Sequence, residues 1–183
     1  ALGKMLNHAA NYGMGANRFS DACLEDASLV CSAQEAQKLL TARSKAFPGI
    51  VAWQQSVANE LKRTRRLVSP HGRTALFYGP IDDETIRDAY SFVPQATVAD
   101  TTNMAWLRLA QLPGYNSDFN VLQQGHDSLL CQVLSQKVRE FCGQLKTIYD
   151  SLGVVVGGKV LVIPFDLQFG LNWGEMKNVT YEP

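Results

Sequence analysis

The middle of the chain reads Leu122-Gln123-Gln124-Gly125-His126-Asp127-Ser128-Leu129-Leu130-Cys131-Gln132-Val133. Two stretches that alternate toward apolar residues flank a short polar segment, and this pattern predicts a β-hairpin with His126 and Asp127 at its tip. An Asp on so short a turn has almost no conformational freedom, so it can hold a divalent metal where a mobile side chain cannot. An isolated His-Asp pair is more often an ordinary polar hairpin tip, and its meaning therefore depends on the rest of the sequence.

Length and composition limit the class of protein that contains this hairpin. The chain has 183 residues, of which 46% are hydrophobic, enough for one sizeable core. Seventeen basic and seventeen acidic residues cancel, so any contact with nucleic acid must come from local placement of charge. The sequence has neither an apolar run of about 18 residues nor a leader pattern. We therefore expect no membrane association and a cytoplasmic protein, in the host cell if the source is viral. The four cysteines lack Cys-x-x-Cys spacing, which favours buried reduced thiols over zinc.

Periodicity predicts helices first and strands later. Helical patterns cover the start of the chain to residue 12, then 18–25, 33–46, 50–66, 82–112 and 135–152, and strand patterns cover 67–69, 74–78, 119–124, 129–133 and 160–169. The chain begins as though within a helix. Ser32 with Glu35 is a capping box, and Pro94 predicts a kink or break in its helix. This order predicts an α+β fold in which the last antiparallel strands form only part of a sheet.

The first of three constellations is Lys4, His8 and Tyr12, which recur at every fourth residue on one helical face, with Gly13 immediately after. A Lys there can contact nucleotide phosphates and donate a proton to departing pyrophosphate, while the ring of Tyr12 can stack near a templating base pair. A surface helix with a chance Lys is the simpler alternative. The pattern resembles Arg-x-x-x-Lys-x-x-x-Phe/Tyr-x-x-x-Tyr-Gly, the nucleotide-binding helix of family A DNA polymerases. His8 stands where that family has Phe or Tyr, so sugar discrimination does not carry over.

The second constellation lies in residues 87–100, where Arg87, Ser91 and Gln95 recur at every fourth position. It resembles the segment of the same family in which Arg, Asn and Gln line one helix face. Polar groups at this spacing can reach the minor-groove acceptors that every base pair offers, which suits an enzyme that checks shape and not sequence. A solvated helix face is the alternative, and Ser91 has a shorter reach than the family's Asn.

The third constellation is the hairpin, whose Gln124, His126 and Asp127 resemble the family's Gln-x-His-Asp-Glu. The resemblance implies that Asp127 binds Mg²⁺ and that Gln124 and His126 contact DNA, with His126 at the primer end. Ser128 replaces the family's Glu. Further stretches with the same resemblance are 47–49, 71–73 and 163–174, so it covers nearly the whole chain.

The resemblance implies the C-terminal portion of a polymerase right hand. Residues 1–80 would form helical fingers, and residues 81–183 part of an antiparallel palm sheet with the catalytic hairpin. The substrates would be dNTPs and primer-template DNA, joined with two Mg²⁺ ions, for which Mn²⁺ can substitute. The family's other metal-binding Asp precedes the nucleotide-binding helix, and Asp82-Asp83-Glu84 is better explained as a helix start. We therefore expect a viral, split enzyme, active only with an N-terminal polypeptide that carries the thumb and the other catalytic Asp. A proteolytic or engineered fragment of a longer polymerase is an equal explanation of the split.

Two alternatives stay open at this point. Single-subunit, phage-type RNA polymerases share this palm and often have His-Asp-Ser, which Ser128 fits. A non-catalytic nucleic-acid-binding relic is the other. The presence of Lys4, Tyr12 and Asp127 together argues against a relic, because plain DNA binding needs none of these three groups in particular.

Overall fold

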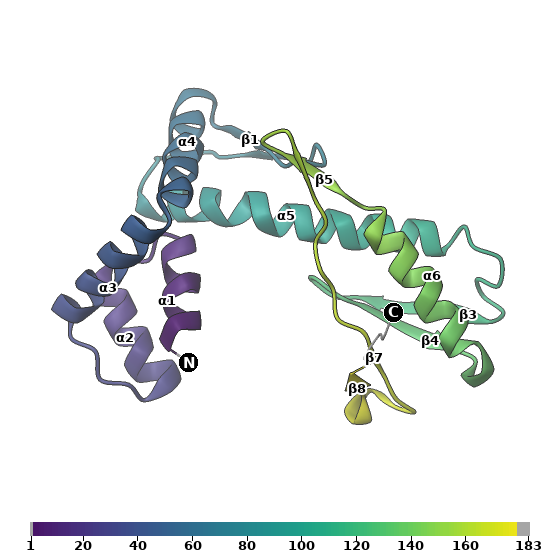
Figure 1. Ribbon diagram of the computed structural model, residues 1–183. Helices are drawn as coiled ribbons and strands as arrows, with labels where there is room; N and C mark the ends of the chain where they lie inside the picture. Colours follow the sequence, from purple (N-terminus) through teal and green to yellow (C-terminus); the bar gives the residue numbers. More distant parts are fainter. Residues whose placement is uncertain (1, 179–183) are drawn as a thin grey trace. The chain divides into compact units, whose positions relative to one another are not determined.

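The computed structural model describes residues 2–178, so Ala1 of the predicted first helix lies outside the described residues (Figure 1). The chain divides into two compact units, the first ending at Ala96 and the second beginning at Thr97. No helix within residues 2–178 is long and apolar enough to cross a bilayer. Helices and short antiparallel strand pairs together make the predicted α+β class.

The first unit is mainly helical. It contains α1 (Leu2–Asn11), α2 (Ala16–Ala27), α3 (Ala33–Ala46), α4 (Pro48–Thr64), the strands β1 (Arg66–Val68) and β2 (Thr74–Leu76), and the first part of α5 (Asp83–Leu109). The predicted capping box is present, since Ser32 Oγ accepts from the Glu35 N–H at 3.3 Å and Glu35 Oε2 accepts from the Ser32 N–H at 2.9 Å. It explains why α3 begins at the predicted residue.

Two apolar clusters hold the first unit together. One packs α1, α2 and α3 around the fully buried Phe19 and Cys23. The other joins α4, β1 and α5 through Leu61, Leu67 and Ala89. Because the apolar residues of α1 face the first cluster, the polar residues of that helix remain toward solvent.

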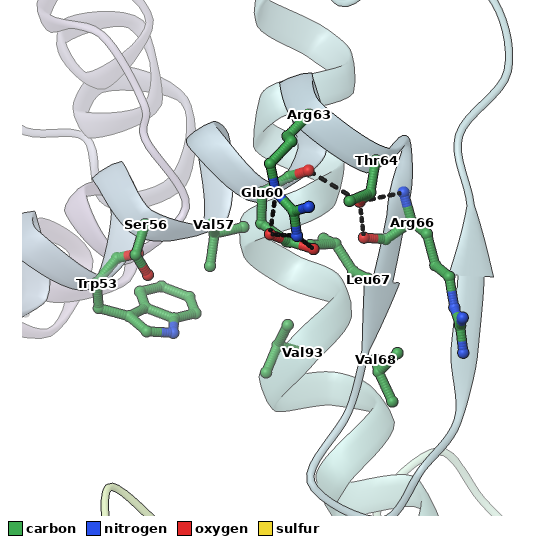
Figure 2. A pocket seen from close by; sticks show the side chains of 10 residues that line it. All are labelled: Trp53, Ser56, Val57, Glu60, Arg63, Thr64, Arg66, Leu67, Val68 and Val93. Carbon is green, nitrogen blue, oxygen red and sulfur yellow. Dashed lines mark hydrogen bonds and ion pairs between the residues drawn. The ribbon is translucent and has the colours of Figure 1, made fainter.

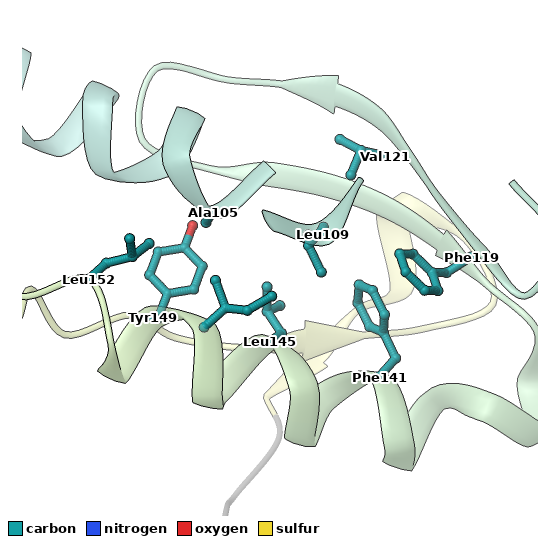
Figure 3. Packing of buried hydrophobic residues seen from close by; sticks show 9 residues of the cluster. Ala105, Leu109, Phe119, Val121, Phe141, Leu145, Tyr149 and Leu152 are labelled. Carbon is teal, nitrogen blue, oxygen red and sulfur yellow. The ribbon is translucent and has the colours of Figure 1, made fainter. Parts of the chain in front are cut away.

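The second unit is built around the predicted hairpin. It contains the end of α5, β3 (Phe119–Gln124), β4 (Leu129–Val133), the 3₁₀ turn η1 (Ser135–Lys137), α6 (Val138–Asp150), β5 (Val154–Val156), β6 (Lys159–Leu161), β7 (Gln168–Phe169), η2 (Trp173–Glu175) and β8 (Lys177–Asn178). The strands β3 and β4 have the predicted bounds. Figure 3 shows α6 packed against them, with Phe141 beside Phe119 and Leu145 toward Leu109.

Two predictions about these elements are wrong, and a third is wrong in part. Residues 160–169 are two short strands, β6 and β7, because the intervening Pro164 has no N–H to donate to a ladder. Among the described residues eight strands form four separate two-stranded pairs, where the sequence predicted five strands. Of the two outcomes predicted for Pro94, a break does not occur, because α5 continues past it to Leu109, and a kink stays a prediction. The fingers and palm division at 80/81 stays a prediction.

Candidate functional site

The end of α1 is fixed by contacts that position its polar face. The Met14 N–H donates to the carbonyl of Ala9 at 2.9 Å, and Gly13, at φ +71°, makes the turn that ends the helix. The side chain of Gln54 on α4 donates to the carbonyls of Ala10 at 2.8 Å and Asn11 at 3.0 Å. The last carbonyls of α1, which have no partner within the helix, are therefore satisfied from α4.

Beside this helix end, two aromatic rings lie one turn apart. The imidazole of His8 meets the ring of Tyr12 edge to face, with the centroids 4.9 Å apart. Tyr12 is half-buried and His8 is exposed. Contact with His8 restricts the Tyr12 ring while one part of it remains accessible to a ligand.

The polar residues of α5 line the same cavity as these rings. The cavity has a volume of about 580 Å³ and is lined by His8, Tyr12, Met14, Gly15, Arg18, Arg87, Asp88, Ser91 and Gln95. Five of the predicted site residues, from two constellations far apart in the sequence, therefore lie around one cavity of the first unit. Ser91 Oγ donates to the Asp88 carbonyl of its own helix at 2.9 Å, which holds the hydroxyl close to the backbone.

Two residues depart from the predicted grouping. Lys4 does not line this cavity and instead lines a neighbouring one of about 200 Å³ with Met5, Phe19 and Asp26. Arg18 lines the larger cavity, although the sequence patterns did not single it out. It is the only basic residue of α2, and its Nη1 pairs with Glu25 Oε2 at 2.9 Å. A lone cation three residues after the turn of Gly13 and Gly15 is the sequence signal for it.

The hairpin tip belongs to the second unit. The Gly125 N–H donates to the Ser128 carbonyl at 2.8 Å, which closes a tight turn with His126 and Asp127 at its two central positions. Both side chains are exposed, and Gln124 is half-buried at the end of β3. A Cβ at position 125 would lie 2.6 Å from Ser128 Oγ, so a larger residue there would require the exposed Ser128 hydroxyl to rotate away.

A rigid base supports this turn. Phe119 and Val121 on β3 are buried against Phe141 of α6, with the Phe119 and Phe141 ring centroids 4.9 Å apart. On β4, burial raises the pKa of the Cys131 thiol to about 11, so this side chain stays an uncharged thiol. The tip therefore extends from a packed hairpin, and Asp127 is held on backbone of defined geometry.

Asp127 fits Mg²⁺ as one ligand of a larger set. Mg²⁺ takes one or two carboxylates from protein and keeps several waters, and an exposed Asp at a rigid tip meets that requirement. Within residues 2–178, however, no three His, Cys, Asp or Glu side chains gather around a common point. Any complete metal site that includes Asp127 needs carboxylates beyond those the described residues bring together.

The acidic cluster Asp82-Asp83-Glu84 stabilises the start of α5, in agreement with its interpretation as a helix start. Asp82 Oδ1 accepts from the Thr85 N–H at 2.9 Å, and this bond, with the Thr85 side chain, lowers the pKa of the Asp82 carboxyl. Asp83 and Glu84 lie in the first turn, where negative charge favours the helix dipole. This geometry supports a structural role for the cluster.

Comparison with known proteins identifies the family. The sequence model described as DNA polymerase family A matches residues 1–175. A DNA polymerase of Mycobacterium phage D29 is 29% identical over 106 residues, which are 58% of this chain and 16% of that protein. DNA polymerase I of Helicobacter pylori strain 26695 is 22% identical over 155 residues, 82% of this chain and 17% of that protein. The chain thus spans about one sixth of the length of these relatives.

A solved structure shows the fold. The polymerase domain of Pol1 from M. smegmatis, in complex with DNA primer-template and dNTP, matches with a TM-score of 0.64 and 18% identity over 82% of this chain and 26% of that chain. The prediction of an α+β portion of a polymerase right hand is therefore confirmed at the level of the fold.

Proposed function

The chain belongs to DNA polymerase family A, as its motifs predicted, and from this membership we propose that it takes part in template-directed DNA synthesis. The reaction is transfer of a nucleotide from a dNTP to the 3′-hydroxyl of a DNA primer. The observation that supports it most strongly is the cavity shared by His8 and Tyr12 with Arg87, Ser91 and Gln95. These residues come from two segments far apart in the sequence, and a solvated helix face would not bring them around one cavity.

In the proposed site, α1 receives the incoming nucleotide. Tyr12 and Gly13 lie beside the nascent base pair, with His8 next to the sugar. The exposed Lys4, two turns before Tyr12, contacts the triphosphate and donates a proton to the departing pyrophosphate. Its position in a separate cavity fits a contact with the phosphates and not with the base.

DNA lies against the polar face of α5 in this proposal. Arg87 and Gln95 are exposed, so both side chains can reach the minor-groove edge of the primer-template duplex. Of the three residues, Ser91 makes the weakest contact with DNA in this proposal, because its hydroxyl already donates to the Asp88 carbonyl. Gln124 and His126 add contacts from the hairpin, with His126 at the primer end.

Asp127 is the proposed metal ligand of this chain. The chemistry supplied by two bound Mg²⁺ ions, or Mn²⁺ in their place, is activation of the primer hydroxyl and neutralisation of the triphosphate. Asp127 contributes one carboxylate, held by the closed turn between Gly125 and Ser128. The closed turn constrains the backbone that carries Asp127, so less conformational freedom is lost when a ligand arrives.

We further propose that another stretch of polypeptide completes the site. The described residues bring no group of three possible metal ligands together, and the relatives are about six times longer than this chain. The missing portion would carry the thumb and the other catalytic Asp, as an N-terminal partner chain in a split viral enzyme. Since the relatives named above come from a phage and a bacterium, the proposed compartment is the cytoplasm of a bacterial cell.

Primer extension tests the proposal. The chain alone should not extend a primed template, and the chain with its N-terminal partner should incorporate dNTPs with Mg²⁺. Replacing dNTPs by ribonucleotides tests the RNA polymerase alternative, which the DNA polymerase relatives do not favour. Absence of extension by the complete assembly would leave the non-catalytic relic as the better description.

A further inference from the structure

The end of α1 depends on a contact from another helix. At this end, the N–H groups of Tyr12 and Gly13 each donate at 3.3 Å, which is longer than the usual distance of about 2.9–3.0 Å. Gln54 of α4 makes shorter bonds to the same turn. Its Nε2 lies 2.8 Å from the carbonyl oxygen of Ala10 and 3.0 Å from that of Asn11. The last turn of α1 is therefore held less by its own backbone than by the Gln54 side chain.

The bond to Asn11 fixes the direction in which the chain leaves α1. The Asn11 carbonyl and the Tyr12 N–H belong to one planar peptide group, so a constraint on this carbonyl also orients the backbone of Tyr12. The Ala10 carbonyl accepts from Gly13 as well as from Gln54, which its two lone pairs allow. Gln54 is half-buried, so water competes less for these carbonyls than at an exposed helix end. Gln54 thus places two residues of the proposed nucleotide site.

Trp53, the residue before Gln54, connects α4 to α5. Figure 2 shows the ring of Trp53 on the same side of α4 as Val57, and it packs against the apolar cluster that joins α4, β1 and α5. Its ring centroid lies 6.2 Å from that of Tyr90, the ring that approaches Gly13. Two consecutive residues of α4 therefore contact the two helices that carry the cavity-lining residues, although neither of them lines the cavity.

We propose that Gln54 is a positioning residue for the incoming nucleotide, because its two hydrogen bonds hold Tyr12 and Gly13 in the arrangement that binds a dNTP. Without these bonds, the ordered end of α1 is populated for a smaller fraction of the time, and the apparent affinity for the nucleotide falls by that fraction. A saturating nucleotide restores the ordered arrangement, so the maximal rate changes little. The role toward dNTPs rests on the proposed function, but the hold on α1 does not.

Three substitutions at position 54 separate hydrogen bonding from shape. Gln54→Met has a similar length and no N–H donor, Gln54→Glu offers only acceptors to two carbonyl oxygens, and Gln54→Lys keeps a donor and places a cation at a helix C-terminus. In single-turnover primer extension by the assembled polymerase, the apparent dissociation constant for dNTP should rise on the order of tenfold for Met and further for Glu, and should stay near wild type for Lys. The control is Gln55→Met, because the exposed Gln55 donates to Asn59 Oδ1 of its own helix at 3.0 Å and should not affect the nucleotide.

Amide hydrogen exchange of the full chain without nucleotide tests the hold on α1 by itself. Gln54→Met should speed exchange at the amides of Gly13 and Met14, and Gln54→Lys should restore the protection. Unchanged exchange in the Met variant, equal losses for Met and Lys, or faster exchange with wild-type dNTP affinity in an active assembly would each overturn the inference. Faster exchange in the Met variant, in an assembly that does not extend primers, would support the hold on α1 and contradict only the proposed function.

Discussion

Gly13 and Tyr90 are in contact so close that they join the end of α1 to α5. A Cβ at position 13 would lie 3.1 Å from both Cδ2 and Cε2 of the Tyr90 ring, and Gly13 has φ +71°. Gly13→Ala therefore adds a steric conflict to a strained backbone, which costs about 1–2 kcal/mol by itself. We expect a loss of at least that size in the free energy of unfolding, measured by denaturant titration, and weaker nucleotide binding.

Gly3→Ala is the matched control for that substitution. Gly3 lies inside α1, where nothing approaches within 4 Å of an added Cβ. Ala at this position should raise stability by about 0.5–1 kcal/mol, because Gly loses more backbone entropy in a helix. Equal effects of the two substitutions would contradict the contact between Gly13 and Tyr90.

Arg43 is a buried cation with an amide as its partner. It is 6% exposed on α3, its Nη2 donates to Asn11 Oδ1, and its Nε has no partner among residues 2–178. Asn11→Ala should destabilise the chain by about 1–3 kcal/mol, because it leaves a second buried donor unsatisfied. The double variant Asn11→Ala/Arg43→Met should recover part of that loss. A double-mutant cycle from denaturant unfolding measures the coupling, and strictly additive losses would contradict it.

The cap at Asp82 predicts a dependence of stability on pH. Hydrogen bonds from Thr85 lower the pKa of the Asp82 carboxyl in the folded chain. The stabilising contribution is therefore complete above the unfolded value of about 3.9 and is lost as pH falls through the lower, folded value. Asp82→Asn should be less stable than the wild type at about pH 6, and the difference should shrink toward about pH 3. A difference that is constant with pH would contradict the cap.

Local signals explain which elements were predicted correctly. The capping box of Ser32 and Glu35 lies within four residues, and the turn between Gly125 and Ser128 within another four, so neither depends on distant packing. The strand predicted at 160–169 failed because alternation alone does not reveal whether a neighbouring strand exists, and Pro164 removes a donor in its middle.

In the candidate site, too, the features that depend on neighbouring residues were predicted, and those that depend on contacts between helices were not. Spacing placed Arg87, Ser91 and Gln95 on one face of α5, but their meeting with Tyr12 depends on contacts such as Gly13 with Tyr90. Helical periodicity contains no information about such contacts, so the sequence did not predict that these residues line one cavity. The sequence did not predict Arg18 as a site residue, because its position at the cavity depends on the orientation of α2 after the turn that ends α1.

Asp127→Asn tests the proposed metal ligand in the assembled polymerase. The extension rate should fall by several orders of magnitude while primer-template affinity changes little, because metal ligation serves the transition state and phosphate contacts serve binding. Asp166→Asn removes the same charge from an exposed position of the second unit and should have near wild-type activity. Rapid-quench extension and anisotropy separate the rate from the affinity. Near wild-type turnover of the Asp127 variant would show that the motif was assigned a wrong role.

The apolar surface after α6 leads to the last prediction. Val160 is 71% exposed, Leu171 97% and Trp173 66%, and β5 and β6 pair only with each other among residues 2–178. Exposed apolar side chains beside unpaired strand edges favour pairing with another chain.

We therefore expect the chain alone to self-associate, and its complex with the rest of the polymerase to bury more than about 2,000 Å², the range of obligate interfaces. Sedimentation velocity at tens of micromolar measures the first expectation. Val160→Lys places a charge on the β6 strand and should shift the chain toward monomer. Leu24→Lys, at a position 60% exposed on α2, is the control and should not change the association. A monomeric wild type that unfolds cooperatively would mean that this surface needs no cover, and the case for a completing polypeptide would then rest on the metal site alone.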